Sequence, residues 1–205
     1  MNPVYAKARR HLSRRDVRLR RLIAKIGPCT LQPMPDHFAL LVRSIISQQI
    51  STKAAKAIHG RLVEQIGNPI RPRAILKATD EELRAAGLSR GKQLSLRDLA
   101  QKCADREVRL AQLADLDDEA VIEQLIPVRG IGRWTAEMFL IFGLGRLDVM
   151  PVADYGLRAG MKREHSLAEL PNRQTLLELT EAWRPYRSIG TWYIWRSFGA
   201  VPQSK

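Results

Sequence analysis

The stretch LIPVRGIGRWTA, residues 125–136, decides the fold of this chain. Apolar residues at helical spacing flank a turn of Gly130, Ile131 and Gly132, which predicts a helix, a tight turn and a second helix from Arg133. Glycines permit positive φ angles and let a backbone approach another surface closely. Amides at a helix start favour an anion such as a phosphate oxygen. The turn therefore indicates either an anion-binding hairpin or a plain connection between helices.

Helical periodicity extends along most of the 205 residues. Two-residue alternation and internal repeats are lacking in the sequence, and the extended stretch 147–152 is too isolated to form a sheet. The predicted fold class is therefore all-α, with two helical lobes as one possible arrangement of a single compact unit. Besides the hairpin, we expect helices over residues 36–50, 51–66, 79–87, 89–99, 117–125, 133–142, 154–161, 173–183 and 188–198.

The charge is strongly positive and unevenly distributed. The chain has 34 basic and 21 acidic residues and a net charge of +13, so a polyanion is the first partner to consider. Residues 1–25 alone carry nine basic side chains against a single acid, Asp16. An apolar stripe in this segment predicts a docked helix with outward arginines, the alternative being a solvated arm. The stripe consists of Val17, Leu19, Leu22, Ile23 and Ile26.

Composition excludes several classes of protein. Cys29 and Cys103 are the two cysteines, too few for a four-ligand zinc or iron–sulfur site, and they give no reason to infer a secreted disulfide scaffold. No uncharged apolar run approaches the roughly 18–20 residues that span a bilayer. The basic start also lacks the apolar stretch and cleavage site of a signal peptide. We expect a cytoplasmic protein, in a bacterial cytosol or nucleoid, with no membrane partner.

Four motifs in a fixed order give the chain a likeness to a known family. They are SQQIS at 47–51, GIGRWTA at 130–136, PVADY at 151–155 and WRPYRS at 183–188, which leads to Trp195. Over roughly residues 30–200 the chain resembles the helix-hairpin-helix (HhH-GPD) DNA glycosylase superfamily, and most closely its 3-methyladenine DNA glycosylase II (AlkA-like) branch.

The resemblance implies a domain organisation. The whole chain, 1–205, would be one glycosylase unit of two helical lobes with the active cleft between them. Residues 36–148, with the hairpin 125–136, would form the central lobe, and 1–35 plus 149–205 the second lobe. We expect the N-terminal β-rich lobe of the best-known bacterial relatives to be absent, with the basic segment 1–25 in its place.

The resemblance also implies an activity. It is that of a monofunctional enzyme of base excision repair, which flips alkylated bases of the 3-methyladenine type out of double-stranded DNA and hydrolyses the glycosidic bond, leaving an abasic site. The family's catalytic carboxylate would be Asp154, which would stabilise the positive charge that develops on the deoxyribose. Asp154 also precedes a short helix, so a helix N-cap is an alternative and compatible role. Superfamily members that also cleave the strand carry a nucleophilic lysine where this chain has Trp134.

Further site residues follow from the same resemblance. A pocket for the extruded base would consist of Trp134, Met138, Tyr155 and Trp195, with Met138 where the nearest relatives carry tyrosine; core packing is the alternative for any single ring. Gln49 would fill the gap left in the duplex, or else form a polar helix end together with Gln48. The DNA backbone would be held by Gly130, Ile131, Gly132, Arg133 and Thr135, with Arg133 as a mobile positive charge. Arg129 stands where relatives usually carry proline.

No cofactor is expected to be required for catalysis. The resemblance implies a structural Na⁺ or K⁺ ion at the hairpin, held by the backbone carbonyls of Ile126, Val128 and Ile131. Enzymes of this kind and size commonly act as monomers, which we expect here too.

Two other functions are compatible with parts of the sequence. A non-catalytic helix-hairpin-helix DNA-binding module explains the charge and the glycines, yet gives Asp154 no purpose. A bifunctional glycosylase/lyase for oxidised bases would need a lysine nucleophile, and Lys92 and Lys162 match no such position.

Overall fold

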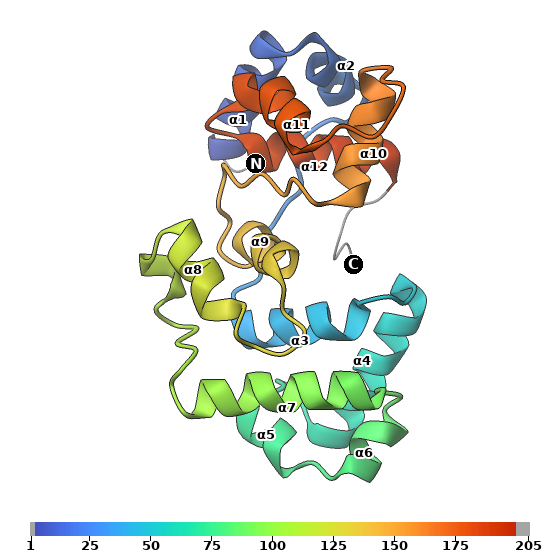
Figure 1. The fold of residues 1–205 in the computed structure, drawn as a ribbon, viewed down its shortest axis with the longest axis vertical. Coiled ribbons are helices and arrows are strands. Elements are labelled where there is room, and N and C mark those ends of the chain that lie inside the picture. The colour runs from blue at the N-terminus through green and yellow to red at the C-terminus, as the bar shows by residue number, and fades with distance from the viewer. Residues whose placement is uncertain (1–2, 200–205) are drawn as a thin grey trace. The chain divides into compact units, whose positions relative to one another are not determined.

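The computed structural model describes residues 3–199, which form helices and no strand, so the prediction of an all-α fold is confirmed (Figure 1). None of the helices in this described range has the length and apolarity to cross a membrane. The chain divides into two compact units: unit 1 comprises Met1–Pro33 and Leu140–Lys205, and unit 2 comprises Met34–Phe139. These divisions follow residues 33 and 139, whereas the resemblance placed them after residues 35 and 148.

Unit 1 is built around a helix whose central residues are all buried. Helix α12 packs against α1, α2 and α10, and every residue from Ser188 to Trp195 is buried. A helix surrounded in this way has no polar face to show, which is why its sequence is apolar around most of its circumference. The helices of unit 1 are α1 (Pro3–Arg15), α2 (Val17–Ile26), α10 (Tyr155–Glu164), α11 (Arg173–Thr180), the 3₁₀ turn η2 (Glu181–Trp183) and α12 (Arg187–Phe198).

The basic N-terminal segment is folded and docked, in two helices rather than the single one expected. The interruption falls at Asp16, whose Oδ1 accepts hydrogen bonds from the amides of Arg18 (2.8 Å) and Leu19 (3.2 Å) and so caps α2. Its Oδ2 accepts a third from Trp183 Nε1 at 2.8 Å. The predicted stripe is buried at Leu19, Leu22 and Ile23, whereas Val17, at the start of α2, is 45% exposed.

Unit 2 is a group of shorter helices around α7, which packs on α3, α5 and α6. Side chains of Asp36, Ser51, Ser89 and Asp117 cap α3, α4, α7 and α8, and Thr79 with Glu82 forms the predicted capping box. The helices are α3 (His37–Ser47), α4 (Thr52–Ile66), α5 (Pro72–Lys77), α6 (Asp80–Ala85), α7 (Arg90–Ala104), the 3₁₀ turn η1 (Leu113–Asp115), α8 (Asp118–Leu125) and α9 (Arg133–Phe142), which continues into unit 1.

The end of α3 and the presence of α5 differ from the sequence-based expectation. Helix α3 ends at Ser47 rather than Ile50, because Gln49 adopts a left-handed φ of +58° that no α-helix contains. The helix α5 was not expected, since it begins at Pro72 and its six residues are too few to show helical periodicity.

We expect Asp16→Ala to lower the free energy of unfolding by about 1–3 kcal/mol, because it removes the cap of α2 and leaves the buried indole N–H of Trp183 without its acceptor. Urea denaturation followed by circular dichroism measures the change. Glu169→Ala is the matched control, since Glu169 is an exposed acid of the same unit. Equal stability of the two variants would contradict the role given to Asp16.

Candidate functional site

The hairpin between α8 and α9 is the tight turn expected from the glycines. The Val128 amide donates to the Leu125 carbonyl at 3.1 Å, and the Ile131 amide donates to the Val128 carbonyl at 3.0 Å. Gly130 has a φ of +80°, and a Cβ there would lie 2.8 Å from Ser95 Oγ. Gly132 has no positive φ, and a Cβ there would meet nothing within 4 Å. The fold therefore requires glycine at 130 but leaves 132 open for contact with another molecule.

Arg133 is not the mobile charge that the sequence suggested. Its guanidinium forms a two-pronged ion pair with Glu119, in which Nη1 and Oε2 are 2.9 Å apart, and its Nε lies 3.3 Å from Glu137 Oε1. These carboxylates raise the pKa of Arg133 further above its usual value. Arg133 nevertheless keeps half of its side chain exposed, so it can still reach an anion beside the turn.

The other residues predicted to hold a DNA backbone differ in what they expose. Gly130 and Gly132 are exposed, whereas the side chains of Ile131 and Thr135 are buried and could contact a ligand through their backbone amides alone. Arg129 is exposed, and its amide donates to Asp98 Oδ2 at 2.7 Å. Tethering to Asp98 fixes the backbone at the position where relatives usually carry proline.

Gln49 occupies the turn between α3 and α4 in the same unit. It is exposed, and its left-handed conformation turns the chain out of α3 into the cap at Ser51, whose Oγ accepts from the Ala54 amide at 3.2 Å. The side chain of Gln48 points toward the hairpin instead, since its Nε2 donates to the Gly130 carbonyl at 2.7 Å. Gln49 is thus a polar side chain at the tip of a defined turn, rather than part of a helix terminus.

Asp154 in unit 1 is buried and firmly held. It is 5% exposed, and its Oδ1 accepts hydrogen bonds from the Leu157 amide at 2.6 Å and from Trp195 Nε1 at 2.8 Å. The first bond makes Asp154 the N-cap of α10, so the capping role is confirmed. The second bond comes from the buried helix α12. A carboxylate with two fixed donors keeps one orientation, which a catalytic group requires.

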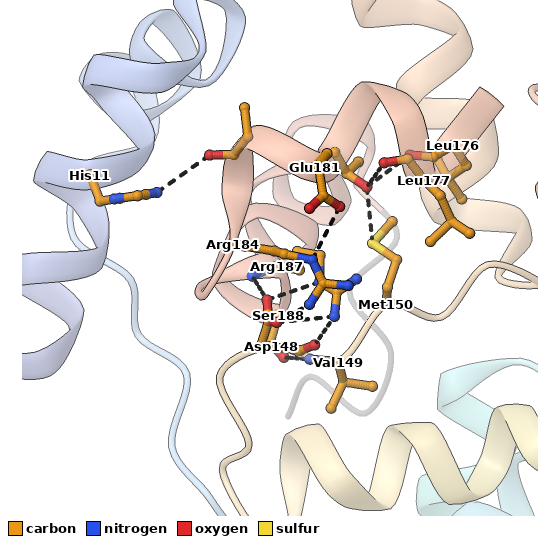
Figure 2. A network of polar contacts seen from close by, with 12 residues as sticks. His11, Asp148, Val149, Met150, Leu176, Leu177, Glu181, Arg184, Arg187 and Ser188 are labelled. Carbon is orange, nitrogen blue, oxygen red and sulfur yellow. Dashed lines mark hydrogen bonds and ion pairs between the residues drawn. The ribbon is translucent and has the colours of Figure 1, made fainter. Parts of the chain in front are cut away.

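A polar network fixes the segment that leads to Asp154 (Figure 2). Asp148 accepts hydrogen bonds from Arg187 Nε at 2.9 Å and from Arg184 Nη1 at 2.9 Å, and its carbonyl accepts from Arg187 Nη2 at 2.8 Å. Ser188 Oγ accepts from the Val149 amide at 2.9 Å. Because both arginines belong to the WRPYRS motif, this motif anchors the chain six residues before Asp154 to the start of α12.

The four residues predicted for a base pocket fall into two kinds. Tyr155 is 68% exposed and Trp134 is 38% exposed, so each offers part of a ring to a ligand. Trp195 and Met138 are fully buried, and the Trp195 ring stacks on Phe142 with centroids 5.8 Å apart. For Trp195 the structure thus combines core packing with the hydrogen bond to Asp154.

Other potential nucleophiles are poorly suited to react. Burial raises the pKa of both Cys29 and Cys103 to about 11, so both thiols stay protonated at neutral pH. Desolvation lowers the pKa of Lys92, which favours the free amine, but its Nζ is held by the carbonyls of Ile46 and, at 3.0 Å, of Gln48. Within residues 3–199, no three His, Cys, Asp or Glu side chains are grouped so as to hold a metal ion.

The sequence reasoning missed three residues that position this site. Gln48, Lys92 and Asp98 all make backbone contacts to the turn at 48–50 or to the hairpin. Their partners lie 82, 44 and 31 residues away in the chain, beyond the range of any local pattern. The stretch GLSRGK, residues 87–92, contains one recognisable signal, the helix cap at Ser89. Nothing in it indicates that Lys92 contacts α3.

Comparison with known proteins identifies the family. A family model described as "HhH-GPD superfamily base excision DNA repair protein" matches residues 42–185. The chain belongs to this superfamily. The match includes the motifs around Gln49, the hairpin and Asp154.

Superfamily members with similar sequences and structures come from a fungus and a bacterium. The "Alkylbase DNA glycosidase-like protein mag2" of Schizosaccharomyces pombe is 32% identical over 198 residues, which cover 94% of this chain and 93% of that protein. The solved structure of S. pombe 3-methyladenine DNA glycosylase (Mag1) in complex with abasic DNA matches with a TM-score of 0.83 at 34% identity, covering 97% of this chain and 100% of that one. The solved structure of a DNA-3-methyladenine glycosidase from Bacillus halodurans matches with a TM-score of 0.81 at 37% identity, covering 92% of this chain and 87% of that one.

The two hairpin glycines should respond differently to alanine. Gly130→Ala forces a Cβ into the left-handed region and against Ser95, so we expect a loss of about 1–2 kcal/mol in the free energy of unfolding. Gly132→Ala should fold as the parent does, but should weaken binding to duplex DNA if the turn approaches a phosphate there. Urea denaturation and fluorescence anisotropy with a labelled duplex measure the two effects. Equal destabilisation of both variants would contradict the geometry assigned to the turn.

Proposed function

We propose that this protein is a monofunctional DNA glycosylase that removes alkylated bases of the 3-methyladenine type from double-stranded DNA and leaves an abasic site. The observation that carries the proposal is the buried Asp154, held by Leu157 and Trp195 about twenty residues after the hairpin. Superfamily membership and the names of the similar proteins support the same substrate class.

The chemistry requires little beyond a fixed carboxylate and water. A purine alkylated at N3 or N7 is cationic, so it leaves as a neutral base when the C1′–N bond breaks. The positive charge then passes to the sugar, where the fixed Asp154 carboxylate stabilises it without having to reorganise. Water adds to C1′ and loses a proton, aided by the same carboxylate, so that hydrolysis yields the free base and an abasic sugar.

Strand cleavage is not part of the proposed reaction. A lyase needs an amine that attacks C1′ and forms a Schiff base. Trp134 stands where bifunctional members carry that lysine, and an indole nitrogen is not nucleophilic. The Lys92 ammonium is occupied by two backbone carbonyls. The expected product is therefore an intact strand with one abasic site.

The exposed rings of Trp134 and Tyr155 are the proposed faces for the extruded base. An aromatic face attracts a cationic alkylated base by about 0.5–2 kcal/mol more than a neutral one. Trp195 would contribute by holding Asp154. The buried thioether of Met138 would shape the base pocket from beneath Trp134, since Trp134 lies four residues earlier on the same side of α9. Selection would then depend on charge and stacking rather than on the base edge.

The hairpin and Gln49 are the proposed grip on the duplex. Gln49 would fill the space that the extruded nucleotide leaves, while amides of the turn hold the phosphate backbone. The superfamily's structural Na⁺ or K⁺ would lie at the carbonyls of Ile126, Val128 and Ile131. The Val128 carbonyl accepts one hydrogen bond, from Ile131, and its second lone pair suits a cation.

Basic side chains of α1 and α2 are proposed to add affinity for DNA that is independent of the lesion. Eight of them are exposed, and Arg9, Arg10, Arg14 and Ser13 line a surface hollow of about 390 Å³. Asp16, the sole acid of the segment, is engaged by the cap of α2 and by Trp183. The segment can therefore neutralise phosphates of a duplex bound by a single copy of the protein.

Asp154→Asn should lower the rate of base release from methylated duplex DNA by a factor of about 10²–10³, because the neutral amide cannot stabilise the charged sugar. Folding should be retained, since asparagine caps a helix as well as aspartate does and its oxygen can accept the Trp195 bond. Release of methylated purines in single-turnover reactions measures the rate.

Asp115→Asn, in an exposed acid of η1, is the control and should behave as the parent does. Borohydride trapping should give no covalent adduct with either variant or the parent. Base release by Asp154→Asn within a few-fold of the parent would remove Asp154 from the mechanism. Equal binding of damaged and undamaged duplexes by the parent, without any base release, would favour a non-catalytic clamp.

The charge of α1 should appear in the salt dependence of binding. The double variant Arg10→Ala/Arg14→Ala should bind undamaged duplex more weakly and reduce the slope of log affinity against log salt by up to about 1.8, since each lost phosphate contact contributes about 0.9. Arg73→Ala/Lys77→Ala removes the same charge from α5 and should leave the slope unchanged. Equal slopes for both double variants would contradict a DNA contact at α1.

A further inference from the structure

One face of α7 contacts both elements that are proposed to grip the DNA. Lys92, Ser95 and Asp98 follow one another at intervals of three residues, which places them on the same side of the helix. Lys92 Nζ donates to the carbonyls of Ile46 and Gln48, at the turn that carries Gln49. Asp98 Oδ2 accepts from the Arg129 amide at 2.7 Å, in the hairpin.

The end of α3 needs a donor from outside its own helix. The last carbonyls of a helix lack partners within it, and a positive charge is favourable there. Helix α3 has no basic residue in its last turn, and the left-handed Gln49 rules out continued helical hydrogen bonding. Lys92 supplies the missing donor from α7 and holds the chain on the residue just before Gln49.

A third contact joins the two elements directly. Gln48 Nε2 donates to the Gly130 carbonyl at 2.7 Å, so the side chain next to Gln49 is fastened to the hairpin. Ser95 Oγ completes the arrangement, because it lies where a Cβ at Gly130 would be, at 2.8 Å. The turn and the hairpin are therefore linked to each other and to the same rigid helix.

We infer that the polar face of α7 sets the spacing between Gln49 and the hairpin, and that Lys92 is a positioning residue for the insertion of Gln49 into the duplex. The inference rests on the proposed function, in which the hairpin holds the backbone and Gln49 fills the vacated stack. Because the hairpin fixes the register of the backbone, the distance from it to Gln49 determines which nucleotide is displaced. Loss of the Lys92 contacts frees the turn, while the hydrogen bonds that hold Asp154 and the hairpin stay in place.

Lys92→Met tests this inference, since methionine keeps an unbranched stem and removes the ammonium donors. One readout is the fluorescence of 2-aminopurine placed opposite a tetrahydrofuran abasic analogue, which reports insertion into the stack without any chemistry. The other is single-turnover base release at saturating protein. Lys92→Met should lose the fluorescence change and release base about 10- to 100-fold more slowly, while its affinity for the duplex changes less than about threefold. Lys92→Arg should recover part of both signals.

Lys77→Met, in an exposed lysine of α5 in the same unit, is the matched control and should behave as the parent does in both assays. If Lys92→Met does not fold, Gln48→Ala breaks the link to Gly130 with a smaller change and should lose the same fluorescence signal. The inference is overturned if Lys92→Met matches Lys77→Met, or if base release falls while insertion is unchanged. A parent that inserts Gln49 but releases no base would refute the proposed glycosylase function alone.

Discussion

The hydrogen bonds to Asp154 Oδ1 are the constraint on which the organisation of unit 1 depends. A carboxylate that is 5% exposed loses most of its hydration, and the Leu157 amide and the Trp195 indole replace part of it. One donor belongs to α10 and the other to α12, so the carboxylate cannot turn unless these two packed helices move. Asp154 thereby serves the fold as a helix cap and the proposed chemistry as a fixed charge.

The Asp148 network extends this constraint along the chain. Arg187 is largely buried, and breaking its pair with Asp148 would leave a charge in the interior, so the pair specifies one position for the segment 148–154. Arg187 is the first residue of α12, and the indole that holds Asp154 comes from two turns further along the same helix. The helix α12 thus fixes both the start of the segment 148–154, through Asp148, and the orientation of the Asp154 carboxylate at its end.

Local patterns in the sequence were sufficient for elements whose causes are local. The cap at Asp154, the capping box at Thr79 and the positive φ of Gly130 in the hairpin turn are each local features of the chain. Contacts between distant segments were not predictable in this way. The sequence showed only that Lys92 matches no catalytic lysine position. Its contact with Gln48 was not predictable, because the two residues are 44 positions apart and no local pattern connects them. The division of segment 1–25 into α1 and α2 was missed, because basic residues interrupt the short buried stripe of Tyr5, Ala8 and Leu12 in α1.

The charges around the hairpin suggest how lesion recognition and general DNA binding are divided. Arg133 is paired with Glu119 and Glu137, so the turn carries less net positive charge than its sequence implies. Its hold on a phosphate would then come mainly from fixed amides, which depend on position more than on long-range attraction. The exposed basic side chains of α1 and α2 are better suited to long-range attraction, which screening by salt weakens. The two parts thus differ in kind: contacts at the hairpin would depend on the position of the phosphate, and those of α1 and α2 on its charge.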